Sequence, residues 1–315
     1  MSEVNLESNG YDTAELDDTL SPDLLPHDVP SAMVQVDLAA QSHQGLVREN
    51  NEDHYLAVRI SRTLQTIMTN LTEGVLPERY DETAYGMLVA DGMGGHAGGE
   101  IASSMALLRL LELVVQTPDW MMKTAAKENA AVIMRRMTNR FRQIDDELRE
   151  RGESDRSLHG MGTTLTAAAT LGSDLFLGHI GDSRAYVLRG ERLLQLTKDH
   201  TLAQALIEAG LAAADDTSTR AMRNVLTAAL GSTGERNDPE VQQLHLNDGD
   251  QLLLCTDGLS EMVADDSITA VLTEADSSAT ACQALVNLAL AGGGKDNVTV
   301  VLARYRFPRN SGSEN

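Results

Sequence analysis

The sequence TTLTAAATLGSDLFLGHIGDSRAYVLRGERLLQL, residues 163–196, decides the fold class. Four short apolar runs, separated by junctions that each contain a glycine, occupy 163–171, 175–180, 185–188 and 193–196. Junctions as short as Gly172-Ser173 leave no room for a crossover helix, so consecutive strands must pair antiparallel. The stretch therefore predicts an antiparallel β-meander.

Further strands and helices are predicted on both sides of this stretch. Strand-like runs occupy 33–38, 54–60, 85–90, 241–246, 251–256 and 298–305, and helical spacing of apolar residues occupies 100–115, 120–151 and 277–290. Residues 199–230 are predicted to mix helix and loop. Runs of strands that alternate with runs of helices favour an α+β layered fold in one domain over a parallel doubly wound sheet.

Composition limits the classes of function. The 315 residues are 42% hydrophobic and 23% charged, which is typical of a soluble protein with a sizeable core. Twenty-five Lys and Arg against 47 Asp and Glu give a net charge of -22, which argues against nucleic acid and anionic membranes as partners. Two cysteines are too few for a disulfide framework, and no segment resembles a membrane span or a secretion signal. We expect a cytoplasmic protein.

The N-terminus has a composition of its own. Residues 1–30 contain eight acids, three prolines and no Lys or Arg, which predicts a disordered acidic tail. An autoinhibitory or docking arm is the less favoured alternative. The expected organisation is a tail at 1–33, one domain at 34–306 and a C-terminal tail at 307–315.

Four carboxylates, each placed at the end of a strand-like run or in a glycine-rich loop, are candidate metal ligands: Glu52, Asp91, Asp257 and Asp296. Asp-Gly is a common turn pair, so each acid alone is weak evidence. Together, if the strand ends converge, the four acids form an all-oxygen site of the kind that Mg²⁺ or Mn²⁺ prefers.

A dinucleotide site is the competing interpretation of one glycine-rich loop. Residues 92–97 satisfy the pattern G-x-G-x-x-G/A after a strand and before a helix, with Glu112 twenty residues further on. However, Asp91 would face the pyrophosphate with a second negative charge, and Glu112 lies inside a predicted helix. The antiparallel meander also contradicts a parallel dinucleotide-binding fold.

Six motifs in order resemble those of the type 2C metal-dependent protein serine/threonine phosphatases, most closely the bacterial branch. They are GLVRENNED (45–53), VADGMGG (89–95), MGTT (161–164), GDSR (181–184), TDGL (256–259) and KDN (295–297). The resemblance covers residues 34–306. It implies a four-layer α/β/β/α sandwich of two antiparallel β-sheets flanked by helices, and an enzyme that hydrolyses phosphoserine and phosphothreonine monoesters in proteins phosphorylated by bacterial kinases.

The resemblance also implies a two-metal site for Mn²⁺ or Mg²⁺. Asp91 would bridge both ions, Asp257 and Asp296 would complete one, and Glu52 with the Gly92 carbonyl would serve the other. Asp53 would contact the metal ligands without binding an ion itself. Water activated by two cations can attack phosphorus without a covalent intermediate.

Arg48 is the candidate phosphate clamp, because a guanidinium can bind two phosphate oxygens at once. Family members often carry a histidine general acid two residues after the bridging Asp, but here that residue is Met93, which cannot donate a proton. His96 is the alternative acid, since its ordinary pKa suits the role. Asp182 and Arg184 are expected to support the site structurally, and the region around 199–236 is expected to form a flap near substrate.

A third, weaker metal site is expected to be altered. The positions where the family commonly has two aspartates carry His159 and Glu261 here, which favours Mn²⁺ over Mg²⁺ or an empty site. Asp155 or another nearby acid is an alternative ligand. A phosphatase-fold module that binds phosphoproteins with little or no turnover remains the alternative function.

Overall fold

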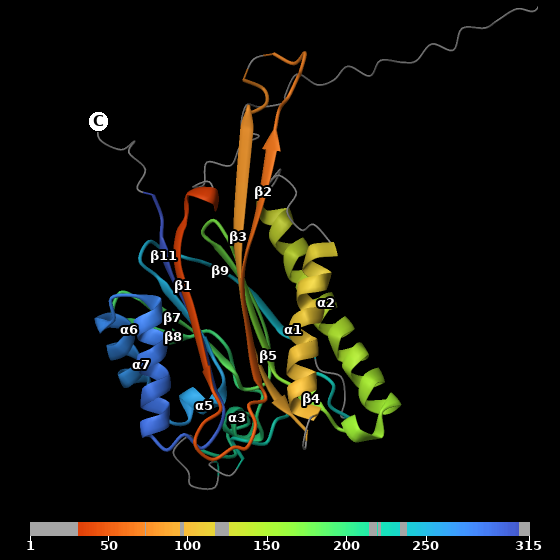
Figure 1. Cartoon of the computed structure of the whole chain (residues 1–315), viewed down its shortest axis with the longest axis vertical. Coiled ribbons are helices and arrows are strands. Elements are labelled where there is room, and N and C mark those ends of the chain that lie inside the picture. Colours follow the sequence, from red (N-terminus) through yellow and green to blue (C-terminus); the bar gives the residue numbers. More distant parts are fainter. Residues whose placement is uncertain are drawn as a thin grey trace, which may run out of the picture.

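The computed structural model describes residues 31–72, 74–94, 98–116, 126–213, 219, 222–233 and 238–308, with the backbone alone at 126–129. The predicted tail therefore lies outside the described residues up to residue 30. Two β-sheets face each other, with one pair of helices packed on each outer surface (Figure 1). The predicted four-layer sandwich is confirmed.

Every strand pair in the two sheets is antiparallel. One sheet has the order β1 (Gln35–His43), β11 (Val298–Arg306), β10 (Gln251–Cys255), β7 (Arg184–Arg189) and β8 (Arg192–Gln195). The other has the order β2 (Asp53–Gln65), β3 (Arg79–Met93), β5 (Leu165–Leu171), β6 (Asp174–Ile180) and β9 (Glu240–His245), and β4 (Gly162–Thr163) pairs with the end of β3.

Four helices form the outer layers. Helices α1 (Gly98–Gln116) and α2 (Ala126–Ser154) cover the sheet that contains β3, and α6 (Asp265–Glu274) and α7 (Ser278–Ala291) cover the sheet that contains β11 (Figure 1). Short helices α3 (Leu202–Glu208) and α5 (Asp257–Ser260) lie at one end of the sandwich, and 3-10 turns occupy Ser31–Met33 and Arg156–Leu158. No helix within the described ranges is long and apolar enough to cross a membrane.

Three buried clusters hold the layers together. Residues such as Val89, Leu177 and Leu254 meet between the two sheets. Each outer face of a sheet packs on its own pair of helices, so β6 is buried at every position after Asp174. Burial on both faces explains why these strands are continuous apolar runs with little alternation.

The predicted single meander is wrong at its centre. Strands β5 and β6 pair in one sheet, whereas β7 and β8 pair in the other. The residues Gly181-Asp182-Ser183 therefore carry the chain from one sheet to the other and do not form a hairpin turn. Gly181 has a φ of 112°, and a side chain there would overlap Thr164. A left-handed backbone at such a close approach requires glycine.

Strands β2 and β3 are longer than their apolar runs predicted. They remain paired out to Gln65 and Arg79, beyond the last pair of β3 with β5 at Ala84. Figure 1 shows the resulting two-stranded ribbon projecting from the body at the end opposite α5. The sequence pattern did not predict this extension, because it contains polar residues such as Arg62, Thr63 and Asp81. Backbone pairing, rather than burial of side chains, stabilises it.

Candidate active site

The predicted ligands converge at the end of the sandwich where α3, α5 and β4 lie (Figure 1). A cleft of about 830 Å³ opens there. All six predicted residues of the metal and phosphate site line it: Arg48, Glu52, Asp91, Gly92, Asp257 and Asp296. Asp53 is buried behind the cleft, and His96 lies outside the described residues.

Strand register places the first group of acids. Asp91 lies near the end of β3 directly opposite Asp53, the first residue of β2. The amide of Asp91 donates to Thr164 Oγ1 at 2.9 Å, and the amide of Gly92 donates to the Glu52 carbonyl at 3.2 Å. A side chain at Gly99 would overlap the Glu52 carboxylate, so glycine lets the first turn of α1 approach it. Two strands and a helix thus meet around Glu52.

Asn297 connects Asp257 and Asp296 with the loop that carries Glu52. Its Nδ2 donates to the carbonyls of Gln44 and Asn50, each at 2.8 Å, and its Oδ1 accepts from the Glu52 amide at 2.8 Å. Asp296 is its chain neighbour, and Asp257 is brought close because Gly258 packs against the Asn297 backbone where no side chain fits. The amide of one asparagine therefore aligns the loop that carries Arg48 and Glu52 with the acids of the other sheet.

The carboxylates are held where their negative charge is unfavourable. Burial raises the pKa of Asp53 to about 7. Burial, followed by repulsion from Asp296 and Glu261, raises the pKa of Asp257 to about 7. Burial and the charges of Asp53 and Asp257 raise the pKa of Asp91 well above its usual value, although Asp91 and Asp257 keep part of their surface open to the cleft.

These acids fit a hard divalent cation. Asp53 Oδ1 and Asp257 Oδ1 are buried oxygens without a hydrogen-bond partner, and bound cations are the usual partners of such clustered oxygens. No three candidate ligand groups among the described residues already stand at metal-binding spacing. Arg48 is the ion-pair partner of Asp296 at this site.

Comparison with known proteins agrees with this geometry. The model of the protein phosphatase 2C family matches residues 78–290. The serine/threonine protein phosphatase PstP of Mycobacterium tuberculosis is 37% identical over 266 residues, which cover 84% of this chain and 44% of PstP. The serine/threonine phosphatase stp of Listeria welshimeri is 35% identical over 216 residues, which cover 69% of this chain and 82% of that protein.

This chain belongs to the protein phosphatase 2C family. A crystal structure of the M. tuberculosis phosphatase PstP/Ppp superposes with a TM-score of 0.69 at 34% identity, over 86% of this chain and 99% of that one. The chain spans less than half the length of the curated relative PstP. The family that the six motifs predicted is confirmed, and the dinucleotide-binding alternative is excluded by the antiparallel sheets.

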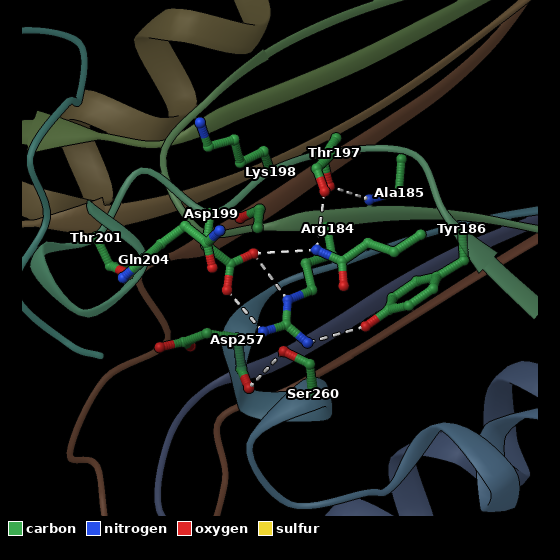
Figure 2. Close-up of polar contacts among 12 residues, drawn as sticks. Arg184, Ala185, Tyr186, Thr197, Lys198, Asp199, Thr201, Gln204, Asp257 and Ser260 are labelled. Atoms are coloured by element: carbon green, nitrogen blue, oxygen red, sulfur yellow. Dashed lines mark hydrogen bonds and ion pairs between the residues drawn. The ribbon is translucent and has the colours of Figure 1, made fainter. Parts of the chain in front are cut away.

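The GDSR motif of this phosphatase 2C chain has an ion-pair partner that sequence reasoning missed. Arg184 donates from Nε and Nη2 to the two oxygens of Asp199, at 2.9 and 2.6 Å, and from Nη1 to the Tyr186 hydroxyl at 3.1 Å. Figure 2 shows the Arg184 guanidinium between Asp199 and Tyr186, beside Asp257 and Ser260. Arg184 thus ties the segment after β8 to β7, next to the cleft.

Asp182, which is predicted to support the site structurally, is among the residues that line the cleft. Burial and the charges of Asp257 and Asp199 raise its pKa well above the usual value. The expected flap contributes Asn224, Val225 and Leu226 to the same wall. Residues 214–218, 220, 221 and 234–237 of this region lie outside the described part.

The raised pKa of Asp53 predicts how the stability of the metal-free protein depends on pH. The pKa of Asp in an unfolded chain is about 3.9. Between about 4 and 7, folded Asp53 keeps a proton that the unfolded chain has lost, so the free energy of unfolding falls as pH rises through this range. In EDTA, the melting temperature should fall less from pH 5 to pH 8 for Asp53→Asn than for the unmodified protein, by calorimetry. Parallel curves for the two proteins would contradict the raised pKa.

Proposed function

We propose that this chain is a metal-dependent protein serine/threonine phosphatase. The observation that carries the proposal is the convergence of Glu52, Asp91, Asp257 and Asp296 on one open cleft, where the buried Oδ1 of Asp257 lacks a hydrogen-bond partner. The phosphatases PstP and stp support it as relatives. The substrates are phosphorylated serines and threonines in proteins, the products of protein kinases.

Two divalent cations are the proposed cofactor. A structure of the PstP catalytic domain in complex with two manganese ions matches this chain with a TM-score of 0.67 at 34% identity. Asp91, Asp257, Asp296 and Glu52, together with the Gly92 carbonyl, all line the cleft and would hold the two ions between them. When bound, such a pair lowers the pKa of a water and offsets charge on the phosphoryl oxygens.

Asp53, Arg48 and His96 have proposed roles other than metal binding. Asp53 accepts a hydrogen bond from Thr256 Oγ1 at 2.8 Å, which ties the start of β2 to the residue before Asp257. Arg48 lies at the cleft with its side chain 56% exposed, so its guanidinium can clamp two oxygens of a phosphoryl group once Asp296 is engaged by a cation. His96 is the proposed proton donor to the leaving oxygen, because Met93 lacks a proton to give.

Turnover distinguishes this proposal from a phosphoprotein-binding module. The full chain should hydrolyse a simple aryl phosphate in the presence of Mn²⁺ and stop when the cation is chelated. Binding of a phosphopeptide without any Mn²⁺-stimulated hydrolysis would instead favour the module.

The proposed third ion near His159 and Glu261 gives a separate prediction. Both residues are exposed, and no hydrogen bond or ion pair within the described ranges joins them. An imidazole in place of a carboxylate supplies a softer ligand that Mg²⁺ accepts poorly. His159→Asp should therefore raise Mg²⁺-supported turnover relative to Mn²⁺-supported turnover in parallel titrations. An unchanged ratio would show that residue 159 takes no part in metal binding.

A further inference from the structure

One segment of α2 has a charge opposite to that of the rest of the chain. Residues 130–143 contain four arginines and no acid, within a protein of net charge -22. Arg142 pairs with Asp238 through two bonds of 2.7 Å. Arg136 and Arg140 lie on the face that also carries Ile133 and Met137, at helical i, i+3 and i+4 spacing, whereas Arg135 points away from that face and is exposed.

An apolar groove lies beside these arginines. It runs between the paired helices α1 and α2 and the sheet beneath them, on the side of the molecule that Figure 1 shows at the right. Val58, Ala84, Val114 and Met137 contribute to its walls, and Arg140 stands among them. Its volume is about 90 Å³. Since an apolar cavity of about 150 Å³ holds a benzene molecule, this groove has room for one aliphatic side chain.

The described chain begins next to this groove. The Thr83 amide donates to Ser31 Oγ at 3.0 Å, and the following residue, Ala84, lines the groove. The thirty residues before Ser31 contain eight acids and no Lys or Arg, with leucines at 20, 24 and 25. Leu25 is six residues from Ser31, a reach of roughly 20 Å when extended. The tail is thus tethered beside a site that complements it in charge and in apolar character.

We propose that the acidic N-terminal segment docks on this groove, with Leu24 or Leu25 in the space between the two helices and the sheet, and with the neighbouring acids Asp23 and Asp28 beside Arg136 and Arg140. The tether supplies a high effective concentration, so a weak contact is sufficient. Ala84 is seven residues from Asp91 along β3, roughly 23 Å. Docking therefore occurs away from the cleft and leaves the cation site free.

Disulfide trapping in the full-length chain tests the contact. The native thiols do not compete, because Cys255 and Cys282 are 0% and 1% exposed. Leu25→Cys combined with Val114→Cys, which lines the groove, should form an intramolecular disulfide several-fold faster than Leu25→Cys combined with Val115→Cys. Val115 is the matched control, since it is the next residue of α1 and is 68% exposed outside the groove.

The second part of the same experiment measures how charge reversal and added salt change the rate of cross-linking. Arg140→Glu, placed in the Val114 pair, should slow the cross-link several-fold, as should 0.5 M salt, whereas Arg135→Glu on the other face should have little effect. Equal rates for the Val114 and Val115 pairs, or equal effects of the two Arg variants, would overturn the proposal. A cross-link found only between two chains would assign the groove to the tail of a second copy and would also overturn it.

A further measurement tests the docking of the N-terminal segment in the unmodified full-length protein, without any substitution. Hydrogen exchange at the amides of residues 23–29 should be at least about tenfold slower in 50 mM salt than in 500 mM salt, because docking shields them and salt weakens docking. Exchange at the rate of an unstructured peptide in both conditions would contradict the proposal.

Discussion

Asp257→Asn is expected to lower kcat by about 10³-fold while the protein remains folded. The substitution keeps the shape of the side chain but removes one of the charges that hold the proposed cation pair. Metal ions contribute several kcal/mol to transition-state charge stabilisation, and each 1.36 kcal/mol is a tenfold change in rate. Asp257 Oδ1 is buried without a partner, so the carboxylate is placed for a ligand rather than for the fold.

Steady-state kinetics in saturating Mn²⁺, together with calorimetric titration of the cation, measure the effect. Asp266→Asn is the matched control, because it removes the same charge from an exposed residue in the first turn of α6. It should keep nearly full activity. Full activity of purified Asp257→Asn would refute the assignment of this acid as a metal ligand.

Arg48→Ala is expected to reduce kcat/KM by roughly 10- to 100-fold, mainly through KM. A hydrogen bond to a charged group contributes about 1.5–3 kcal/mol, and loss of binding shared by substrate and transition state raises KM. Arg48→Lys should recover only part of the loss, because an ammonium cannot bind two oxygens in a fork.

The affinity for Mn²⁺ distinguishes a phosphate-binding role of Arg48 from a structural role. Arg48 is the ion-pair partner of Asp296, so its removal frees a proposed ligand. Arg48→Ala should therefore bind Mn²⁺ at least as tightly as the unmodified protein in calorimetric titration. Loss of both cations in this variant would contradict the phosphate-clamp role.

Sequence patterns predicted the strands and the acids because both signals are local. Asp91 ends an apolar run and Asp257 follows another, and strand ends of a sandwich gather at common edges. The register that sets Asp53 opposite Asp91 is fixed by the pairing of β2 with β3. The expected placement of these acids in one cleft therefore agrees with the structure.

Other features depend on contacts between distant residues, which no local pattern encodes. To predict that the chain crosses between the sheets at Gly181, one must know that Thr164 packs against this residue. The pair of Arg184 with Asp199 and the bonds of Asn297 to Gln44 and Asn50 join segments 15 to 253 residues apart. Helix α6 was not predicted, because only Ile268 and Leu272 are buried within its ten residues.

Phosphate release from a phosphothreonine peptide is the most direct test of the central claim. The full-length chain, treated with EDTA and then supplied with Mn²⁺, should hydrolyse the peptide only after the cation is added, and Asp257→Asn should stay inactive under both conditions. Release of phosphate at the same rate in EDTA as in Mn²⁺ would contradict the account, because the carboxylate cleft would then have no role as a metal site.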